Sequence, residues 1–246
     1  MGQTVGILSG KGGTGKTSVC AGVAQALAQD GERVLCVDCD VGLGNLDISL
    51  GLTELGGLSF LDVSEGGYAL DQALRHPIYP NLSFLAAPMN RPSEQIDPAA
   101  FLKLMALARK EYDYVLLDAP AGVDAGFRLV AAAAERFLLV TGPGPAALRD
   151  AAQVGAILER MGKTDVRLVV NRVDKDMLSL VRMTIDDVMD AAGLPLAGVV
   201  LEDPAVTLAA SFGKPILQYN KRSPAAKAYG RIARRLQGFP AAMPLR

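Results

Sequence analysis

The sequence predicts an α/β fold, in which a doubly wound, mostly parallel β-sheet carries helices on both faces. Short apolar runs, which are typical of buried strands, alternate along the whole chain with longer Ala-rich stretches of helical character. The composition agrees with a compact parallel sheet, because 50% of the 246 residues are hydrophobic and only 5% are aromatic. Since α/β folds often exceed about 200 residues without dividing, we expect one domain over residues 1–246.

Seven apolar runs are expected to form the strands of this sheet. They are residues 4–9, 33–38, 82–86, 114–118, 137–141, 166–171 and 196–201, and the clearest helices between them are 16–29, 98–110 and 146–161. Residues 56–92 are the least regular segment, for which we expect loops and short helices. In a sheet of this kind, ligands bind at the carboxyl ends of the strands.

The first expected strand is followed by a glycine-rich loop with the phosphate-binding pattern G-x-x-x-x-G-K-[ST]. Its glycines allow backbone N–H groups to surround phosphate oxygens. Lys16 can reach the β- and γ-phosphates, the Thr17 hydroxyl can bind Mg²⁺, and the next helix adds its positive N-terminal end. The alternative is a purely structural strand-to-helix turn. The candidate nucleotide-binding residues here are Gly10, Lys11, Gly12, Gly13, Thr14, Gly15, Lys16, Thr17 and Ser18.

Lys11 is one lysine more than such a loop needs for its own nucleotide. With Lys11 included, the pattern K-G-G-x-G-K-[ST] resembles the deviant Walker A motif of the MinD/ParA family of P-loop ATPases. The resemblance implies ATP and Mg²⁺ as cofactors and a homodimer that encloses two ATP molecules. It also implies that Lys11 and Lys16 are catalytic, with Lys11 reaching the nucleotide of the partner subunit. The alternative for Lys11 is a solvated loop lysine.

Carboxylates follow two of the expected strands. Asp38 and Asp40 lie two residues apart where the second strand ends, so one could support Mg²⁺ through water and the other could position the attacking water. The alternative is a capped turn before a helix. Asp118 ends an apolar strand and is followed by Ala-Pro-Ala-Gly. By resemblance, Asp40 is catalytic and positions the water, while Thr17, Asp38 and Asp118 are the metal residues, the aspartates acting through water.

Three further positions carry expectations. The resemblance assigns Asn171, at the end of the strand expected over 166–171, to recognition of the adenine base, and Arg172 beside it is a further candidate for nucleotide binding. A plain turn is an equal alternative. It also places a regulator at Arg149 and Asp150, where an ordinary helix start is an equal alternative. His76 is the only histidine and lies in a Pro-flanked loop, so we expect it at the surface.

Cysteine content and terminal patterns favour a reducing cytoplasm. Of the three cysteines, Cys20, Cys36 and Cys39, the last two are three positions apart, a spacing that places them on opposite faces of a β-strand. We therefore expect all three to be small core residues rather than ligands. The N-terminus has no signal-peptide pattern, and no apolar run approaches the roughly 18 residues that span a bilayer.

Charge is distributed unevenly along the chain. The last 43 residues hold eight basic and no acidic residues, so the first 203 carry a net charge of −9. Such asymmetry indicates either an anionic partner or complementarity between the two parts of the chain. Ser223 and Pro224 should open a helix with an apolar stripe of Tyr229, Ile232, Ala233 and Leu236. We expect this stripe to dock on the sheet; the alternative is a membrane anchor. Residues 239–246 contain two prolines and should form a short flexible tail rather than the membrane-anchor helix of typical MinD proteins.

The resemblance is strongest to the MinD type, through residues 42–51 and the Asp-Ala-Pro-Ala-Gly segment. It implies a slow, partner-stimulated ATPase that dimerises with ATP, positions the septum machinery and takes a protein regulator. Peripheral contact with the anionic inner face of the cell membrane is compatible with the basic tail. The alternative is a ParA-like DNA-partition or flagellar-placement ATPase that binds DNA or a protein adaptor, for which DNA is the less favoured target.

Overall fold

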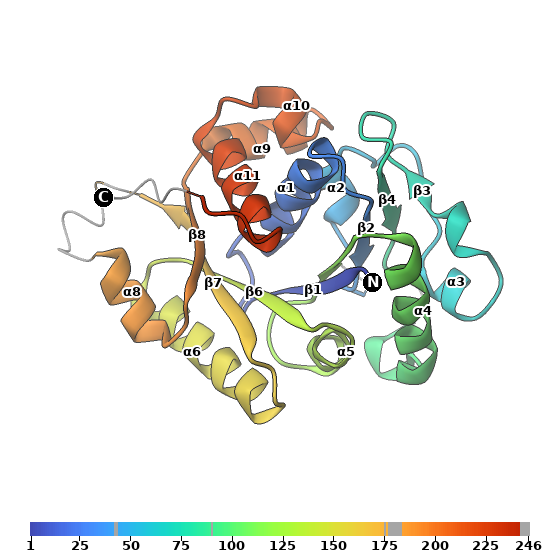
Figure 1. Cartoon of the computed structure of the whole chain (residues 1–246), viewed down its shortest axis with the longest axis horizontal. Coiled ribbons are helices and arrows are strands. Elements are labelled where there is room, and N and C mark those ends of the chain that lie inside the picture. The colour runs from blue at the N-terminus through green and yellow to red at the C-terminus, as the bar shows by residue number, and fades with distance from the viewer. Residues whose placement is uncertain (42–43, 90, 175, 177–183, 242–246) are drawn as a thin grey trace.

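The computed structural model describes residues 1–41, 44–89, 91–174, 176 and 184–241 (Figure 1). In these residues, eight strands form one sheet in the order β3-β4-β2-β5-β1-β6-β7-β8, and every neighbouring pair is parallel except β3 with β4. The strands are β1 (Gln3–Leu8), β2 (Val34–Asp38), β3 (Leu74–Arg75), β4 (Leu82–Leu85), β5 (Tyr114–Asp118), β6 (Arg136–Thr141), β7 (Asp165–Val173) and β8 (Leu196–Leu201). The predicted mostly parallel sheet is confirmed, and β1 lies in its middle.

The strand β3 is the one element of this sheet that the sequence did not predict. It has two residues and pairs antiparallel with β4 at the edge of the sheet, Leu74 opposite Phe84. A two-residue strand is too short to show an alternating pattern, so hydrophobic periodicity could not reveal it. The seven predicted strands are present, with ends that differ by at most two residues.

Helices cover both faces of the sheet, as Figure 1 shows. One face carries α1 (Lys16–Gln29), α2 (Leu46–Leu50), α9 (Pro204–Ser211), α10 (Ile216–Asn220) and α11 (Pro224–Leu236). The other carries α3 (Phe60–Ser64), α4 (Pro98–Glu111), α5 (Ala125–Ala133), α6 (Pro145–Arg160) and α8 (Ile185–Ala192). Two short 3₁₀ turns lie at Leu70–Gln72 and Ser93–Gln95.

Alternate residues of each central strand enter different cores, as the pleat requires. In β2, Val34 and Cys36 join the core under α1, whereas Leu35 and Val37 join the core under α4 and α5. The sheet is therefore buried on both faces, which explains the unbroken apolar runs that predicted its strands. All three cysteines are buried, which confirms the prediction that they are core residues.

The C-terminal helix α11 docks on the sheet as predicted. Ser223 caps it by accepting a hydrogen bond from the Ala226 amide, and Pro224 occupies its first turn. The stripe of Tyr229, Ile232, Ala233 and Leu236 is buried against α1 and β8. Of the tail predicted over 239–246, residues 242–246 lie outside the described residues. No helix among the described residues has the length and apolar character needed to cross a bilayer.

The prediction that His76 lies at the surface is wrong. Its side chain is 2% exposed, and its Nε2 lies 2.8 Å from the carbonyl oxygen of Leu50. Its Nδ1 accepts hydrogen bonds from the amides of Ile78 and Tyr79. Burial results because the connection between β3 and β4 packs against the end of α2, a contact between segments that local composition does not reveal.

Candidate functional site

The candidate site lies at the carboxyl end of β1, where a loop leads into α1. Gly13 and Gly15 adopt φ values of 78° and 82°, in the left-handed region that favours glycine. A Cβ atom at Gly15 would lie 2.2 Å from Nδ2 of Asn171, so the position has no room for a side chain. Among the described residues, no side chain caps the start of α1, so the first amides of the helix are available to an anion.

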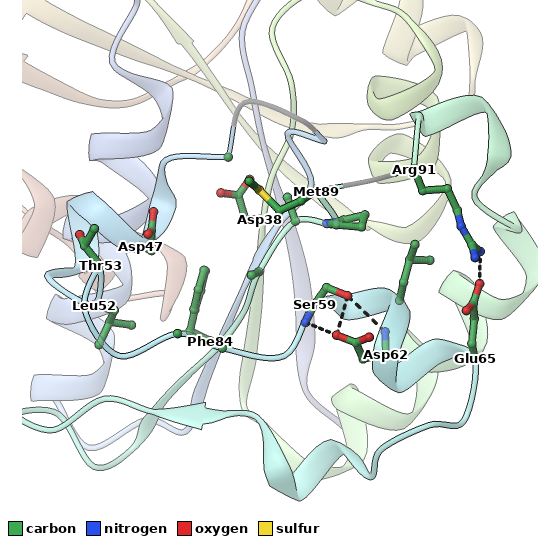
Figure 2. Close-up of a pocket in the computed structure, with 17 residues that line it drawn as sticks. Asp38, Asp47, Leu52, Thr53, Ser59, Asp62, Glu65, Phe84, Met89 and Arg91 are labelled. Carbon is green, nitrogen blue, oxygen red and sulfur yellow. Dashed lines mark hydrogen bonds and ion pairs between the residues drawn. The ribbon is translucent and has the colours of Figure 1, made fainter.

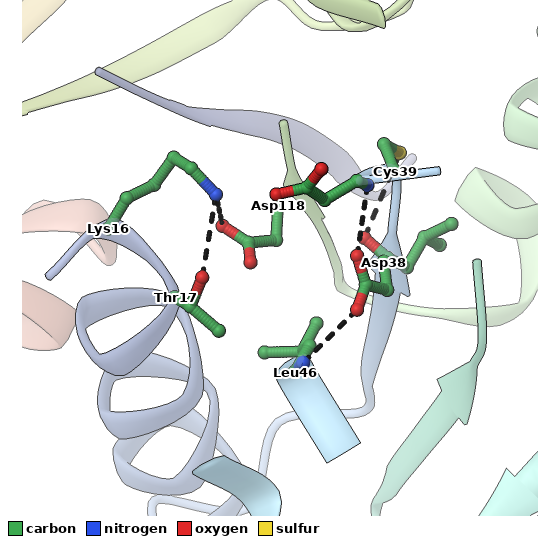
Figure 3. A network of polar contacts seen from close by, with 8 residues as sticks. Lys16, Thr17, Asp38, Cys39, Leu46 and Asp118 are labelled. Atoms are coloured by element: carbon green, nitrogen blue, oxygen red, sulfur yellow. Dashed lines mark hydrogen bonds and ion pairs between the residues drawn. The ribbon is translucent and has the colours of Figure 1, made fainter. Parts of the chain in front are cut away.

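Lys16, the first residue of α1, is buried and paired with the carboxylate that ends β5. Its Nζ lies 2.6 Å from Oδ1 of Asp118 and 3.5 Å from Oγ1 of Thr17, as Figure 3 shows. Burial alone would lower the pKa of Lys16, but the Asp118 carboxylate outweighs it and the pKa is raised. In this arrangement, Lys16 holds a carboxylate in the place where phosphate oxygens are expected, and Asp118 is not open to solvent.

Asp38 lies beside Asp118 because β2 and β5 pair in register at these two residues. Its Oδ1 accepts from the Asp40 amide at 2.9 Å, and its Oδ2 accepts from the Leu46 amide at 3.1 Å. Burial, reinforced by the negative charge of Asp118, raises the pKa of Asp38 to about 7. Asp40 is less buried than Asp38, and desolvation raises its pKa while Lys16 opposes the shift. The sheet therefore brings Lys16 and the three predicted carboxylates together.

Asn171 and Arg172, at the end of β7, also lie against the phosphate loop. The buried Asn171 amide donates to the carbonyl oxygen of Thr14 at 2.7 Å. Arg172 has a φ of 58° and pairs with Glu202, while its Nη1 donates to the Gly13 carbonyl at 3.3 Å. Both side chains thus support the loop in this structure, and base recognition by Asn171 and nucleotide binding by Arg172 remain predictions.

The remaining loop residues face outward to different degrees. Lys11 and Gly12 are exposed, while Thr17 and Ser18 are half-buried. A hollow of about 360 Å³ separates Lys11 from the start of α6. Gly10 packs against Asp150 of α6, where an added Cβ would lie 2.7 Å from the Asp150 Cβ. Arg149 is exposed on the same helix, one residue before Asp150.

The predicted magnesium residues fit a site completed by phosphate and water. Among the described residues, no group of three or more His, Cys, Asp or Glu side chains could hold a metal ion. Mg²⁺ is usually held by one or two protein oxygens together with substrate phosphates and waters. Thr17, Asp38 and Asp118 supply hydroxyl and carboxylate oxygens around the loop, and the buried Thr14 hydroxyl has no hydrogen-bond partner within the described part of the chain. This oxygen-rich donor set fits Mg²⁺.

A cleft of about 570 Å³ includes Asp38 in its lining, as Figure 2 shows. Asp47, Phe84 and Met89 line it, and its outer rim carries the ion pair between Arg91 and Glu65. Most of its wall comes from residues within 56–92, the segment that the sequence marks as least regular. The sequence therefore gave no signal for this cleft.

Comparisons with known proteins agree with this site. A family model of the CobQ/CobB/MinD/ParA nucleotide binding domain matches residues 5–216. The chain is 35% identical over 240 residues to the septum site-determining protein MinD of Synechocystis sp., which covers 97% of this chain and 90% of that protein.

Two solved structures from other organisms have the same fold. The MinC:MinD cell division protein complex of Aquifex aeolicus matches with a TM-score of 0.89 and 33% identity, over 99% of this chain and 98% of that one. MinD of Pyrococcus horikoshii, complexed with Mg-ADP, matches with a TM-score of 0.83 and 28% identity, over 96% of each chain.

Proposed function

The chain belongs to the CobQ/CobB/MinD/ParA nucleotide-binding family, and on that premise we propose that it is a MinD-type ATPase: a single domain that dimerises around ATP and positions the cell-division machinery. The relatives named septum site-determining proteins support the biological role, and the Mg-ADP complex of a similar protein supports the nucleotide and the metal.

The observation that carries the proposal is that two lysines of one loop differ in burial. Lys16 is buried inside its own subunit, where it faces Asp118. Lys11 is exposed on the rim and makes no hydrogen bond or ion pair with any other described residue. An exposed ammonium group at the edge of a phosphate site can bind a phosphate group of the nucleotide held by a second subunit.

The residues of this chain then have distinct tasks. The loop amides and the start of α1 bind the phosphates, and Lys16 exchanges the carboxylate of Asp118 for phosphate oxygens. Asp40, less buried than its neighbours, orients the attacking water, and Lys11 of the other subunit stabilises charge on the transferred phosphoryl group. Thr17, Asp38 and Asp118 would hold Mg²⁺, the aspartates through water, and the ion would neutralise charge on the phosphates.

The experiment that tests this proposal compares Lys11→Ala with Lys16→Ala. We expect Lys11→Ala to bind a fluorescent ATP analogue with wild-type affinity while failing to dimerise with ATP in analytical ultracentrifugation. Lys16→Ala should lose nucleotide binding. Lys103→Ala, which removes an exposed lysine of α4, is the matched control and should dimerise normally. ATP-dependent dimers of Lys11→Ala would refute the role of Lys11 across the interface.

A protein regulator completes the proposed cycle. A complex with MinC among the similar structures supports such a partner. Arg149 and Asp150 are the residues that we propose for its docking, because α6 carries them beside the phosphate loop, with Asp150 in contact with Gly10. A regulator seated there would be close enough to respond to the bound nucleotide.

We propose an anionic membrane as the surface that the dimer contacts. After Asp203, five exposed basic side chains have no ion pair with any described residue; they are Lys214, Lys221, Arg222, Lys227 and Arg234. Pelleting with anionic vesicles in ATP but not in ADP is the expected result. ATP-dependent binding to DNA, without vesicle binding, would instead support the ParA-like alternative.

A further inference from the structure

The short helix α2 connects the candidate site to the interior of the protein. At its first residue, the amide of Leu46 donates to Oδ2 of Asp38, as Figure 3 shows. Oδ1 of the same carboxylate accepts from the Asp40 amide. The position of α2 therefore affects where the Asp38 carboxylate lies and, through the hydrogen bond from the Asp40 amide, where Asp40 lies.

Two buried side chains from distant parts of the sequence hold the other end of α2. Gln25 of α1 donates from Nε2 to the carbonyl oxygen of Ser49 at 3.3 Å, and it is 0% exposed. His76 lies 2.8 Å from the carbonyl oxygen of Leu50. The last carbonyls of a helix lack partners within the helix, so both donors meet groups that the helix itself leaves unpaired.

Each of these side chains is itself fixed by a second contact. Oε1 of Gln25 accepts from the Leu217 amide of α10, which orients the amide group. Nδ1 of His76 accepts from two backbone amides, so the proton resides on Nε2 and points at α2. The residue after α2, Gly51, packs against Pro215 so closely that an added Cβ would lie 2.8 Å from its ring. The far end of α2 therefore has little freedom to shift.

We propose that Gln25 and His76 are positioning residues for ATP hydrolysis, which set the placement of Asp38 and Asp40 by holding the end of α2. The inference rests on the proposed ATPase function. It predicts an effect on kcat rather than on nucleotide binding, because the phosphates are held by the loop at the start of α1 and not by α2.

The two contacts of His76 can be separated by substitution. In His76→Gln, the longer amide can still donate to the Leu50 carbonyl but no longer accepts from the turn. In His76→Asn, the shorter amide can still accept from the turn but does not reach Leu50. In Gln25→Glu, the carboxylate keeps the contact with Leu217 and loses the donor to Ser49. Ser223→Ala is the matched control, because it removes a buried cap of α11 that does not touch α2.

The test measures kcat and KM for ATP, the affinity for a fluorescent nucleotide, and Tm for all four variants. We expect His76→Asn and Gln25→Glu to lower kcat at least fivefold with nucleotide affinity within twofold of wild type. His76→Gln should keep kcat within twofold, and Ser223→Ala should lower Tm without lowering kcat. An unchanged kcat in His76→Asn, or a loss of kcat that follows Tm in every variant, would overturn the proposal.

Hydrogen exchange separates this proposal from the ATPase assignment. In both impaired variants the amides of residues 46–50 should exchange faster, with no change in α11. If the wild-type protein hydrolysed no ATP, the proposed function would fail, and unchanged exchange in residues 46–50 would overturn the role of Gln25 and His76 independently.

Discussion

Removal of Asp118 should destabilise the nucleotide-free protein more than most single substitutions. The Lys16 and Asp118 side chains are 7% and 1% exposed and lie 2.6 Å apart. Breaking a buried ion pair by deleting one partner costs about 3 to 5 kcal/mol, because the other charge remains buried and unpaired. This cost cannot exceed about 5 kcal/mol, because Lys16 can lose its proton instead of remaining charged and unpaired. Deprotonating a lysine of ordinary pKa at pH 7 requires about that free energy.

Asp118→Ala also relieves the repulsion that raises the pKa of Asp38, so we expect a cost near the lower bound, about 3 kcal/mol. For a chain of this size, that loss corresponds to a fall in Tm of about 6 to 12 °C. Urea denaturation without nucleotide, monitored by circular dichroism, measures the free energy of unfolding.

The double variant Lys16→Met/Asp118→Leu is the control, because it removes both charges and should recover most of the lost stability. The reasoning would be refuted if Asp118→Ala cost less than about 1 kcal/mol, or if the double variant were as unstable as the single one.

Other predictions concern the pH dependence and the packing of the fold. The pKa of Asp38 is raised to about 7 in the folded state, so its contribution to stability is fully present at low pH and is lost as the pH rises through 7. Between pH 5 and 8, nucleotide-free wild type should therefore lose about 2 to 3 kcal/mol relative to Asp38→Asn; equal slopes in the two denaturation series would contradict this. Gly22→Ala places a Cβ 2.1 Å from the Tyr229 ring and should lower the free energy of unfolding by about 1 to 3 kcal/mol. Gly230→Ala, in a helix where the new Cβ meets nothing within 4 Å, should instead raise Tm, because alanine is the better helix former.

Much of the candidate site followed from local pattern. The glycines and lysines from Gly10 to Thr17 predicted the phosphate loop. A buried strand is an unbroken apolar run in the sequence, so the ends of two such runs placed Asp38 and Asp118 at strand ends, as the structure has them. The cap and the apolar stripe of α11 could also be predicted from the sequence, because both depend on residues within a few positions of one another.

Contacts between segments that are distant in the sequence could not be predicted from local pattern. The pairing of Lys16 with Asp118 and that of Asn171 with Thr14 join residues 102 and 157 positions apart. They depend on the strand order, which places β5 and β6 on either side of β1. Local composition likewise put His76 at the surface, although the end of α2 covers it.

The sequence by itself determined the fold class, the phosphate loop and the residue types at the strand ends, because these depend on periodicity and on spacing over a few residues. Only the tertiary structure decided that Lys16 faces a carboxylate, that Asp38 and Asp118 share a buried edge, and that Gln25 meets the end of α2. The physical reason is that these interactions are set by which strands become neighbours and how helices pack on them, and that choice is made by the whole core at once.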